Sequence, residues 1–250
     1  MLFFLYNQNL AIHILKPFRK TKANFSLIRE ILRIGLPNGL ENSVFQLGKI
    51  IVQSLVASFG TVAIAANAVA NTFASLGSIP GSAVSLSMIT VIGQSLGAGK
   101  EKEAKKYLKQ LLIFAHLAMG VLNIAIIVFR EQLMNIYHLS QPSKELTIQL
   151  VVFYAIVSSL LWPESFSLPN ALRAAKDVKF TLWVSLVSMW TIRIGFSYLL
   201  ARGLGMGVMG VWVAMVLDWL LRSVCFAFRI FSGKWLSQIR KFEAVEKENI

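Results

Sequence analysis

Six long apolar stretches, separated by short loops that hold most of the charge, constrain the fold of this chain more than any other feature. A helix needs about 20 apolar residues to cross a hydrocarbon core about 30 Å thick. Because backbone polar groups must be hydrogen bonded within lipid, the pattern predicts an all-α, polytopic membrane protein with six transmembrane helices. The stretches cover residues 35–58, 62–95, 110–130, 146–170, 180–202 and 208–231.

The charge distribution supports this reading and gives an orientation. Only 15% of the residues are charged and the net charge is +13, whereas a soluble domain averages about 25% charged residues. Lysine and arginine cluster before the first stretch, between the second and third, between the fourth and fifth, and after the sixth. That alternation predicts a multi-pass protein of the cell membrane with both termini in the cytoplasm. A basic face with interleaved aromatic residues is missing, so nucleic acid is not an expected partner.

Glycine and proline predict interruptions within the apolar stretches. Residues 62–95 would extend about 51 Å as one straight helix, and the cluster at 77–81 is expected to break them. Pro163 is expected to open the fourth stretch, and glycines between 203 and 210 to close a tight hairpin between the last two. Residues 100–109 (KEKEAKKYLK) resemble a short charged interfacial helix, with a solvated loop as the alternative.

A polar stripe follows one face of the first stretch, and a second stripe follows the next stretch. Such stripes cannot face lipid, so they face either neighbouring helices or a wet cavity. Asparagine and glutamine in such a stripe can be explained equally by hydrogen bonds between helices or by a cavity. Charged groups in mid-membrane are harder to explain by helix packing alone. We predict that a substrate and ion pathway is lined by Glu41, Asn42, Gln46, Lys49, Asn67 and Asn71.

Glu164 follows Trp162 and Pro163 in the fourth stretch. Proline removes a backbone donor and frees a carbonyl, and transporters often build ion sites at such broken helices. We therefore assign Glu164 to the same pathway, as a carboxylate that binds H⁺ or Na⁺. The alternative is a glutamate that only satisfies the kinked helix.

The hairpin between the fifth and sixth stretches predicts a charge cluster. Arg193 and Asp218 lie at similar distances before and after the turn near residue 205, so they should reach the same depth. Arg222 follows Asp218 by one turn on the same helix face. We interpret the three as a structural charge cluster that holds the hairpin, with a role in tuning the pathway as the alternative.

Catalytic and metal-binding chemistry has little support. Cys225 is the only cysteine, and His13, His116 and His138 lack the spacing of metal ligands, so each histidine is interpreted as unremarkable. No Ser/His/Asp arrangement or nucleotide motif is present. We expect neither an enzyme nor a cofactor beyond a coupling ion.

Several motifs, taken in order, resemble those of the multidrug and toxic compound extrusion (MATE) family. They are residues 34–37 (IGLP), 91–99 (VIGQSLGAG) and 171–177 (ALRAAKD). Residues 210–212 (GVW) and 218–222 (DWLLR) are similar to a subgroup of that family. The resemblance implies secondary antiport of drug-like molecules or organic cations against Na⁺ or H⁺, within a twelve-helix fold of two lobes.

The resemblance also implies a domain organisation. Residues 24–232 would form the C-terminal six-helix lobe, after the end of a preceding helix and a cytoplasmic linker in 1–23. Residues 233–250 would be a charged cytoplasmic tail. The expected partners are the lipid bilayer, a small drug-like substrate, and either the missing N-terminal lobe or a second copy of this chain.

Two other functions stay open at this point. A lipid-linked oligosaccharide flippase of the same superfamily would share the fold, although a strongly cationic cavity would be expected of it. A truncated, non-transporting fragment would also fit a chain that holds a single lobe.

Overall fold

The structure is a computed structural model that describes residues 25–237. The expected linker and most of the expected tail lie outside this range, so their boundaries stay predictions. The chain divides into two compact units, residues 1–44 and 45–250. The first described helix, α3 (Phe25–Ala57), runs across that division. The account below concerns the larger unit.

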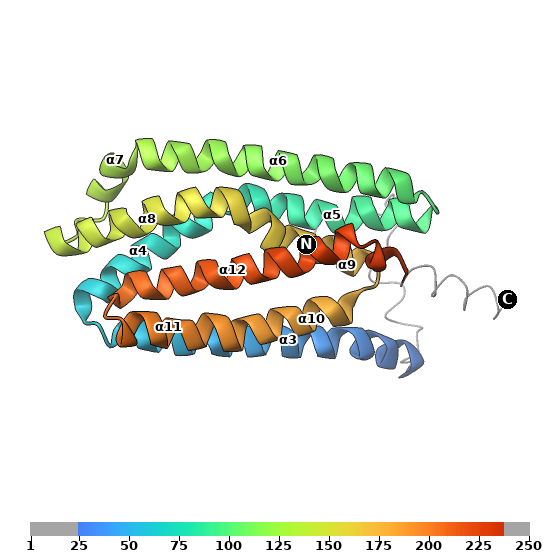
Figure 1. Cartoon of the computed structure of the whole chain (residues 1–250), viewed down its shortest axis with the longest axis horizontal. Coiled ribbons are helices and arrows are strands. Elements are labelled where there is room, and N and C mark those ends of the chain that lie inside the picture. Colours follow the sequence, from blue (N-terminus) through green and yellow to red (C-terminus); the bar gives the residue numbers. More distant parts are fainter. Residues whose placement is uncertain (1–24, 238–250) are drawn as a thin grey trace, which may run out of the picture. The chain divides into compact units, whose positions relative to one another are not determined.

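The larger unit is a bundle of helices, and no strand occurs among the described residues (Figure 1). α12 packs against α8, α9, α10 and α11 and lies at the centre of these contacts, while α5 packs against α6 and α9, and α4 against α8. After α3, the helices are α4 (Thr61–Gly77), α5 (Ile79–Gly97), α6 (Glu101–Val128), α7 (Arg130–Asn135), α8 (Gln141–Trp162), α9 (Leu168–Ala174), α10 (Val178–Val187), α11 (Phe196–Tyr198) and α12 (Gly207–Phe231).

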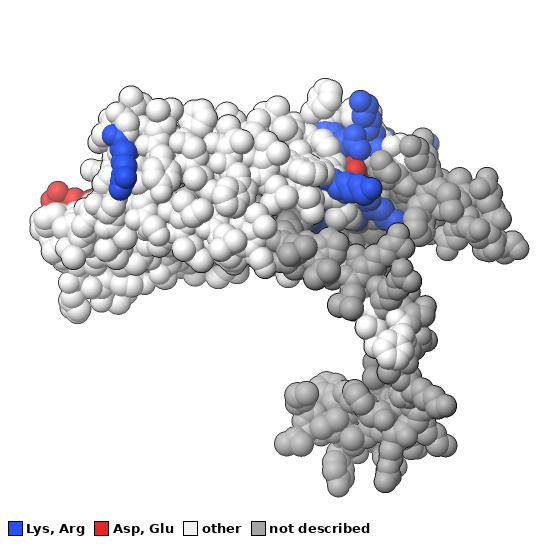
Figure 2. All heavy atoms as spheres, turned by 90° about the horizontal axis from the view of Figure 1, so that it is seen from below, with Lys and Arg blue, Asp and Glu red and all other residues white. Residues whose placement is uncertain are grey.

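Five helical segments are long and apolar enough to cross a membrane: Ile79–Gly97, Glu101–Val128, Gln141–Ala174, Val178–Gly203 and Gly207–Phe231. Two shorter apolar helices, Ser43–Ala57 and Thr61–Gly77, account for the described part of the first expected span and for the first half of the second. Large apolar side chains are exposed along α6, as expected where a helix faces lipid. On the face shown in Figure 2, lysine and arginine gather toward one end of the larger unit, a basic group and an acidic group lie near its other end, and the band between them is uncharged.

The expected break in the second stretch is confirmed. α4 ends at Gly77 and α5 begins at Ile79, with Pro80 in the first turn of α5, where a missing N–H costs little. Both expectations for 100–109, a separate interfacial helix and a solvated loop, are wrong. Residues 101–109 form the first turns of α6, because Glu101 and Glu103 suit a helix N-terminus and no helix breaker follows them.

Two crossings change from α-helical to π-helical hydrogen bonding. In the fourth, η1 (Pro163–Ser167) follows α8 directly, which confirms the expected opening at Pro163. In the fifth, η2 (Ser188–Gly195) and η3 (Leu199–Gly203) flank α11, although no proline is present. Such π-helical turns are rare and are frequent at functional sites.

An ion pair joins the chain after α9 to the end of α12. The Arg229 Nε atom donates to Asp177 Oδ2 at 2.7 Å and Nη2 donates to Oδ1 at 3.2 Å. The guanidinium also lies 4.7 Å from the centroid of the Phe180 ring. This two-point contact fixes α10 beside α12 at the end of the lobe where α12 finishes.

Candidate functional site

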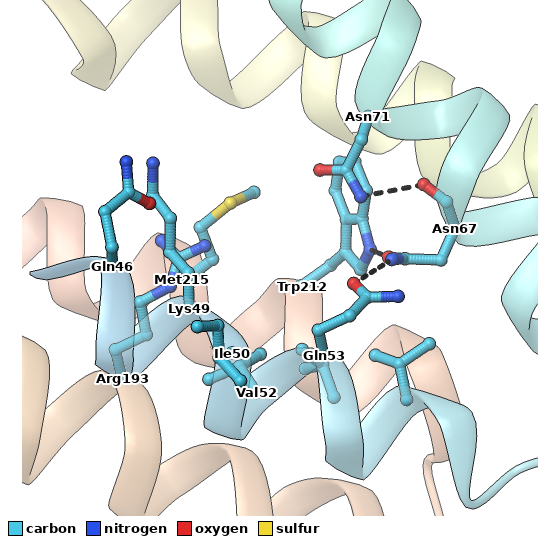
Figure 3. A pocket seen from close by; sticks show the side chains of 12 residues that line it. Gln46, Lys49, Ile50, Val52, Gln53, Asn67, Asn71, Arg193, Trp212 and Met215 are labelled. Carbon is cyan, nitrogen blue, oxygen red and sulfur yellow. Dashed lines mark hydrogen bonds between the residues drawn. The ribbon is translucent and has the colours of Figure 1, made fainter.

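A cavity of about 410 Å³ opens among α3, α4, η2 and α12. Its lining includes four of the residues predicted for the pathway: Gln46 and Lys49 from α3, and Asn67 and Asn71 from α4. Gln53, from the same α3 stripe, also lines it, together with Arg193 and Trp212 (Figure 3). The structure therefore brings the two polar stripes together around one space, and their role in transport stays a prediction.

The side-chain amide of Asn67 fixes one end of this cavity. Asn67 is buried, and its Nδ2 atom donates to Gln53 Oε1 at 3.0 Å. The Trp212 indole Nε1 donates to Asn67 Oδ1, also at 3.0 Å. Asn71 Nδ2 donates to the Asn67 backbone carbonyl at 2.8 Å. Asn67 therefore orients Gln53, Trp212 and Asn71 from a single position, as Figure 3 shows.

The described wall of the cavity is cationic. Lys49 and Arg193 both contribute to it, and no carboxylate is among its described lining residues. Lys49 is exposed, whereas the Arg193 side chain is largely buried and faces Asp218. The charge offered to a bound molecule on this wall is therefore mainly that of Lys49, among neutral amides.

The backbone of α3 includes Glu41 and Asn42, but their side chains lie outside the described part of the structure. Their assignment to the pathway stays a prediction.

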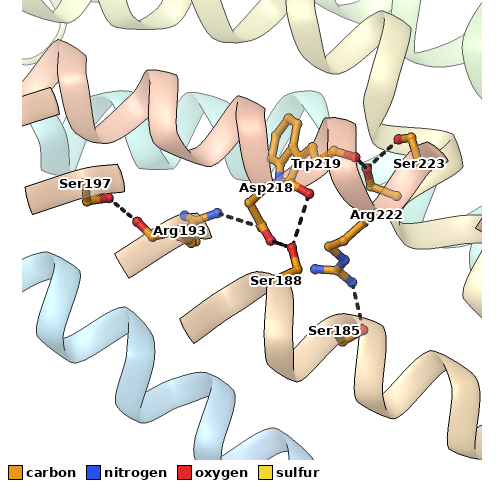
Figure 4. Close-up of polar contacts among 9 residues, drawn as sticks. Ser185, Ser188, Arg193, Ser197, Asp218, Trp219, Arg222 and Ser223 are labelled. Atoms are coloured by element: carbon orange, nitrogen blue, oxygen red, sulfur yellow. Dashed lines mark hydrogen bonds and ion pairs between the residues drawn. The ribbon is translucent and has the colours of Figure 1, made fainter. Parts of the chain in front are cut away.

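The expected proximity of Arg193 and Asp218 is confirmed. Arg193 Nη1 lies 3.9 Å from Asp218 Oδ2, and Asp218 is completely buried. The Ser188 hydroxyl donates to Asp218 Oδ1 (Figure 4). Ser188 is the first residue of η2, and Arg193 lies near its end. The π-helical segment therefore presents a hydroxyl and a guanidinium to the same carboxylate. This arrangement compensates a charge that would be costly alone in lipid.

Arg222 lies one turn further along α12 and is also buried. Its Nη2 atom donates to Ser185 Oγ at 3.4 Å. Its guanidinium lies over the ring of Phe166 at 4.7 Å and over that of Phe45 at 5.5 Å. Cation–π contacts of this kind stabilise a desolvated guanidinium, and here they join the kink of the fourth crossing to α12.

Glu164 lies in a different place from the other predicted pathway residues. It lines a second cavity, of about 660 Å³, together with residues of α6 and α12. Lys105 and Lys109 line this cavity nearer the start of α6, and Leu168 and Ile230 are among its apolar lining residues. Glu164 was expected to share one pathway with the amide stripes, but it does not line the first cavity.

His116 faces Glu164 and was missed by the sequence analysis. Its Nε2 atom lies 2.7 Å from Glu164 Oε1, and its Nδ1 atom lies 2.8 Å from the backbone carbonyl of Ser159. Pro163 has no N–H to offer that carbonyl, so the break in α8 supplies an acceptor that His116 uses. The available signal was an ionisable residue in the middle of an apolar span, which is by itself a reason to expect a function.

An aromatic chain lies between the two cavities. Tyr154 packs edge-on against Trp212, which lines the first cavity, and against Trp219, with ring centroids 5.8 and 5.7 Å apart. Trp219 packs on Phe166 at 5.7 Å, and Phe166 lies two residues after Glu164. The π-helical kink is therefore in packing contact with the wall of the amide-lined cavity.

Comparisons with known proteins agree with this architecture. A probable multidrug resistance protein NorM of Bacillus subtilis is 31% identical over 216 residues, which are 84% of this chain and 46% of that protein. Its counterpart in Thermotoga maritima is 26% identical over 207 residues, or 83% and 44% of the two chains. The chain thus spans about half the length of these curated relatives.

A solved structure shares the fold. The crystal structure of a MATE protein in the bent conformation superposes with a TM-score of 0.77 at 17% identity, covering 97% of this chain and 53% of the other. The family model described as MatE matches residues 37–199. With its polar cavities inside a membrane-spanning helical bundle, the chain therefore belongs to the MatE family of transporters.

Proposed function

We propose that this chain is one lobe of a cation-coupled antiporter that exports drug-like molecules across the cell membrane. The observation that carries the proposal is the amide-lined cavity among α3, α4, η2 and α12. A membrane-spanning bundle gains nothing in stability from such a polar cavity, whereas a transporter needs one to bind a solute in lipid. Relatives named as probable multidrug resistance proteins support export.

In this proposal the first cavity binds the drug-like molecule. Gln46 and Asn71 offer amide donors and acceptors, and Lys49 offers a cation. The described wall suits neutral or anionic groups of a drug, since an organic cation would need a counter-charge from elsewhere. Glu41 on α3, or the other lobe of the transporter, would provide that counter-charge.

Glu164 is the proposed coupling carboxylate. Binding of H⁺ or Na⁺ at this position changes the charge at the kink of the fourth crossing. The aromatic chain from Phe166 to Trp212 gives that kink a mechanical contact with the drug cavity. Release of the ion on one side and drug on the other would couple the two fluxes.

The test is efflux of a fluorescent drug from cells that express the complete transporter containing this chain. Glu164→Gln keeps the size of the side chain and removes its charge, so gradient-driven efflux should be lost while expression stays unchanged. Glu145→Gln, at an exposed position of α8, is the matched control and should leave efflux intact. Normal efflux by Glu164→Gln would remove Glu164 from the mechanism.

The flippase alternative receives less support. The relatives are named for drug resistance. The cavity wall also carries little net positive charge for a site that would hold a lipid-linked sugar, because Arg193 is paired with Asp218 and Lys49 alone remains. Complementation of a flippase-deficient strain tests it directly. Growth of that strain without drug efflux would replace the export proposal.

The companion of this lobe is proposed to be a second six-helix lobe. Either an N-terminal lobe on the same chain or a second copy of this chain would cover the polar stripes of α3 and α4. Cysteine crosslinking from exposed positions of α4 in native membranes distinguishes the two, because only a second copy gives a symmetric dimer.

A further inference from the structure

The proton count of the His116–Glu164 pair follows from its two hydrogen bonds. The carbonyl of Ser159 can only accept, so His116 Nδ1 at 2.8 Å must carry a hydrogen. The contact of 2.7 Å between His116 Nε2 and Glu164 Oε1 needs one more hydrogen between two groups that otherwise both present lone pairs. The distance is that of a charge-assisted hydrogen bond and leaves no room for a metal ion between the atoms.

Both contacts therefore need at least one proton between the two groups. A second proton, on Oε2, would be a donor without an acceptor, because Oε2 is buried and has no hydrogen-bond partner within the described part of the chain. The electrically neutral pair is thus the form that satisfies both contacts. The pair is then either an imidazolium beside a carboxylate or an imidazole beside a carboxylic acid. Loss of one proton to water leaves a net charge of −1 and removes the hydrogen that joins Nε2 to Oε1. Deprotonated Glu164 would thus lose its described donor.

We propose that His116 and Glu164 form a proton-dependent tie between α6 and the π-helical kink at Pro163–Ser167, which holds a single shared proton in the conformation seen here. The inference rests on the proposed antiport function and specifies its coupling ion at this position as H⁺. His116 favours H⁺ at this position, because one proton satisfies both Nε2 and Oε1, whereas a sodium ion cannot lie between atoms that are 2.7 Å apart.

Hydrogen bonds connect the kink to three neighbouring helices. On α12, the Ser165 hydroxyl donates to the backbone carbonyl of Trp219 at 2.7 Å and lies 2.8 Å from the Ser223 hydroxyl, and Arg222 adds a cation–π contact with Phe166. The Ser167 hydroxyl lies 2.7 Å from that of Ser85 on α5. Glu164 makes the third tie, to α6, and it is the only one of the three whose hydrogen-bonding groups are titratable. Loss of its proton therefore loosens α6 from the kink while the ties to α5 and α12 remain.

The surroundings supply a route for the proton and few competing charges. The second cavity adjoins the pair, and its described titratable lining residues are Lys105, Lys109, His116 and Glu164. Lys109, the nearer lysine, precedes His116 by seven residues, about 10 Å along the helix axis, and Lys105 by 11 residues, about 16 Å. α5 carries no titratable side chain, and the α12 residues that line the cavity are Ala227, Ile230 and Phe231. The charged α12 residue at the kink is Arg222, whose guanidinium lies 4.7 Å over the Phe166 ring. The side chains of His116 and Glu164 are 31% and 27% exposed, so they can exchange a proton with water in the cavity.

Nitrogen NMR of the purified protein with ¹⁵N-labelled histidine tests the proton count without any transport assay. The chain has three histidines, so His116→Gln identifies the signals of His116. His116 should carry a hydrogen on Nδ1 throughout, and on raising the pH its Nε2 signal should change in one step that Glu164→Gln abolishes or shifts. The control His138→Gln, in an exposed loop, should leave that step unchanged. A ring protonated on Nε2 alone, or a His116 step that is the same in Glu164→Gln, would overturn the proposal.

The predicted loosening has its own readout. Spin labels at Leu117 on α6 and Leu160 on α8, both exposed, report the separation of the two helices beside the pair. They are introduced as cysteines in a Cys225→Ser background, which removes the only native thiol. The separation should increase across the titration in the wild type and stay constant with pH in Glu164→Gln. A constant separation in the wild type, while the proton is lost, would contradict the tie.

These results separate this inference from the proposed function. If efflux follows a Na⁺ gradient alone and the pair does not titrate as one, the proton tie fails and export stands. If the pair titrates as expected but no gradient drives efflux, the tie stands and the export function fails.

Discussion

At the scale of single residues, the cavity depends on one buried amide. Asn67 accepts from the Trp212 indole and donates to Gln53, so removing its side chain leaves an indole N–H without an acceptor in a buried position. An unsatisfied buried donor costs about 1–3 kcal/mol. Asn67 is therefore expected to act on drug binding through the positions of its neighbours.

Asn67→Ala should lower the free energy of unfolding by about 1–3 kcal/mol, the cost of the unsatisfied indole. Thermal unfolding in detergent measures the loss, and indole fluorescence of Trp212 should change with it. Asn71→Ala, at an exposed neighbouring position, is the control and should have little effect on stability. Equal stability of the Asn67→Ala variant would show that the network does not hold the wall.

Lys49 is predicted to act on substrate charge. Lys49→Gln should raise the KM for a carboxylate-bearing drug by about threefold to fivefold, because an exposed ion pair contributes up to about 1 kcal/mol. The KM for an uncharged drug should not change. Efflux kinetics with a matched pair of drugs, one with the carboxylate and one with its amide, measure the difference. An identical rise for both drugs would mean that Lys49 holds the cavity wall and does not read charge.

At the scale of helices, the last two crossings approach closely because of glycine. A Cβ atom at Gly210 would lie 2.7 Å from the backbone nitrogen of Ala201 and 2.8 Å from the backbone carbon of Leu200. Backbone cannot move away as a side chain can, so only glycine allows α12 this close to η3. That approach sets the depth at which Asp218 meets Arg193.

Gly210→Ala should destabilise the lobe by about 1–3 kcal/mol, the usual cost of overpacking. It should also weaken the Arg193–Asp218 contact. Gly120→Ala on α6 is the control, since a Cβ there meets nothing within 4 Å. It should be neutral or raise stability by up to about 1 kcal/mol, because alanine favours helix. Thermal unfolding of both variants measures these two effects. An unchanged melting temperature for Gly210→Ala would contradict the claim that α12 and η3 pack too closely for a side chain.

Local chain geometry made two kinds of feature predictable from the sequence. One is the pair of helix breaks at Ser78 and Pro163, and the other is that Arg193 and Asp218 lie at the same depth in the bundle. Proline fixes where hydrogen bonds fail, and a hairpin fixes relative depth by residue count. The partner of His116 could not be predicted, since Glu164 is 48 residues away and the contact depends on how the kink turns the fourth crossing. The π-helical turns of η2 contain no proline and left no comparable local signal.

At the scale of the whole molecule, the lobe holds two cavities with different chemistry. The cavity among α3, α4, η2 and α12 offers amides and a lysine, and the cavity between α6 and α12 contains the His116–Glu164 pair. The π-helical kink and the aromatic chain lie between them. In the proposed mechanism, helix packing couples an ion site in one cavity to a drug site in the other, so variants in the aromatic chain should uncouple the fluxes without abolishing binding.

The most direct test of this account is ion counterflow in proteoliposomes that contain the complete transporter. An imposed gradient of a transported drug, with no ion gradient, should drive protons in the opposite direction, and a pH-sensitive dye inside the vesicles reports them. We predict proton counterflow that depends on the drug, is lost in Glu164→Gln and persists in Glu145→Gln. Drug movement without any counterflow of protons or Na⁺ would contradict the antiport account.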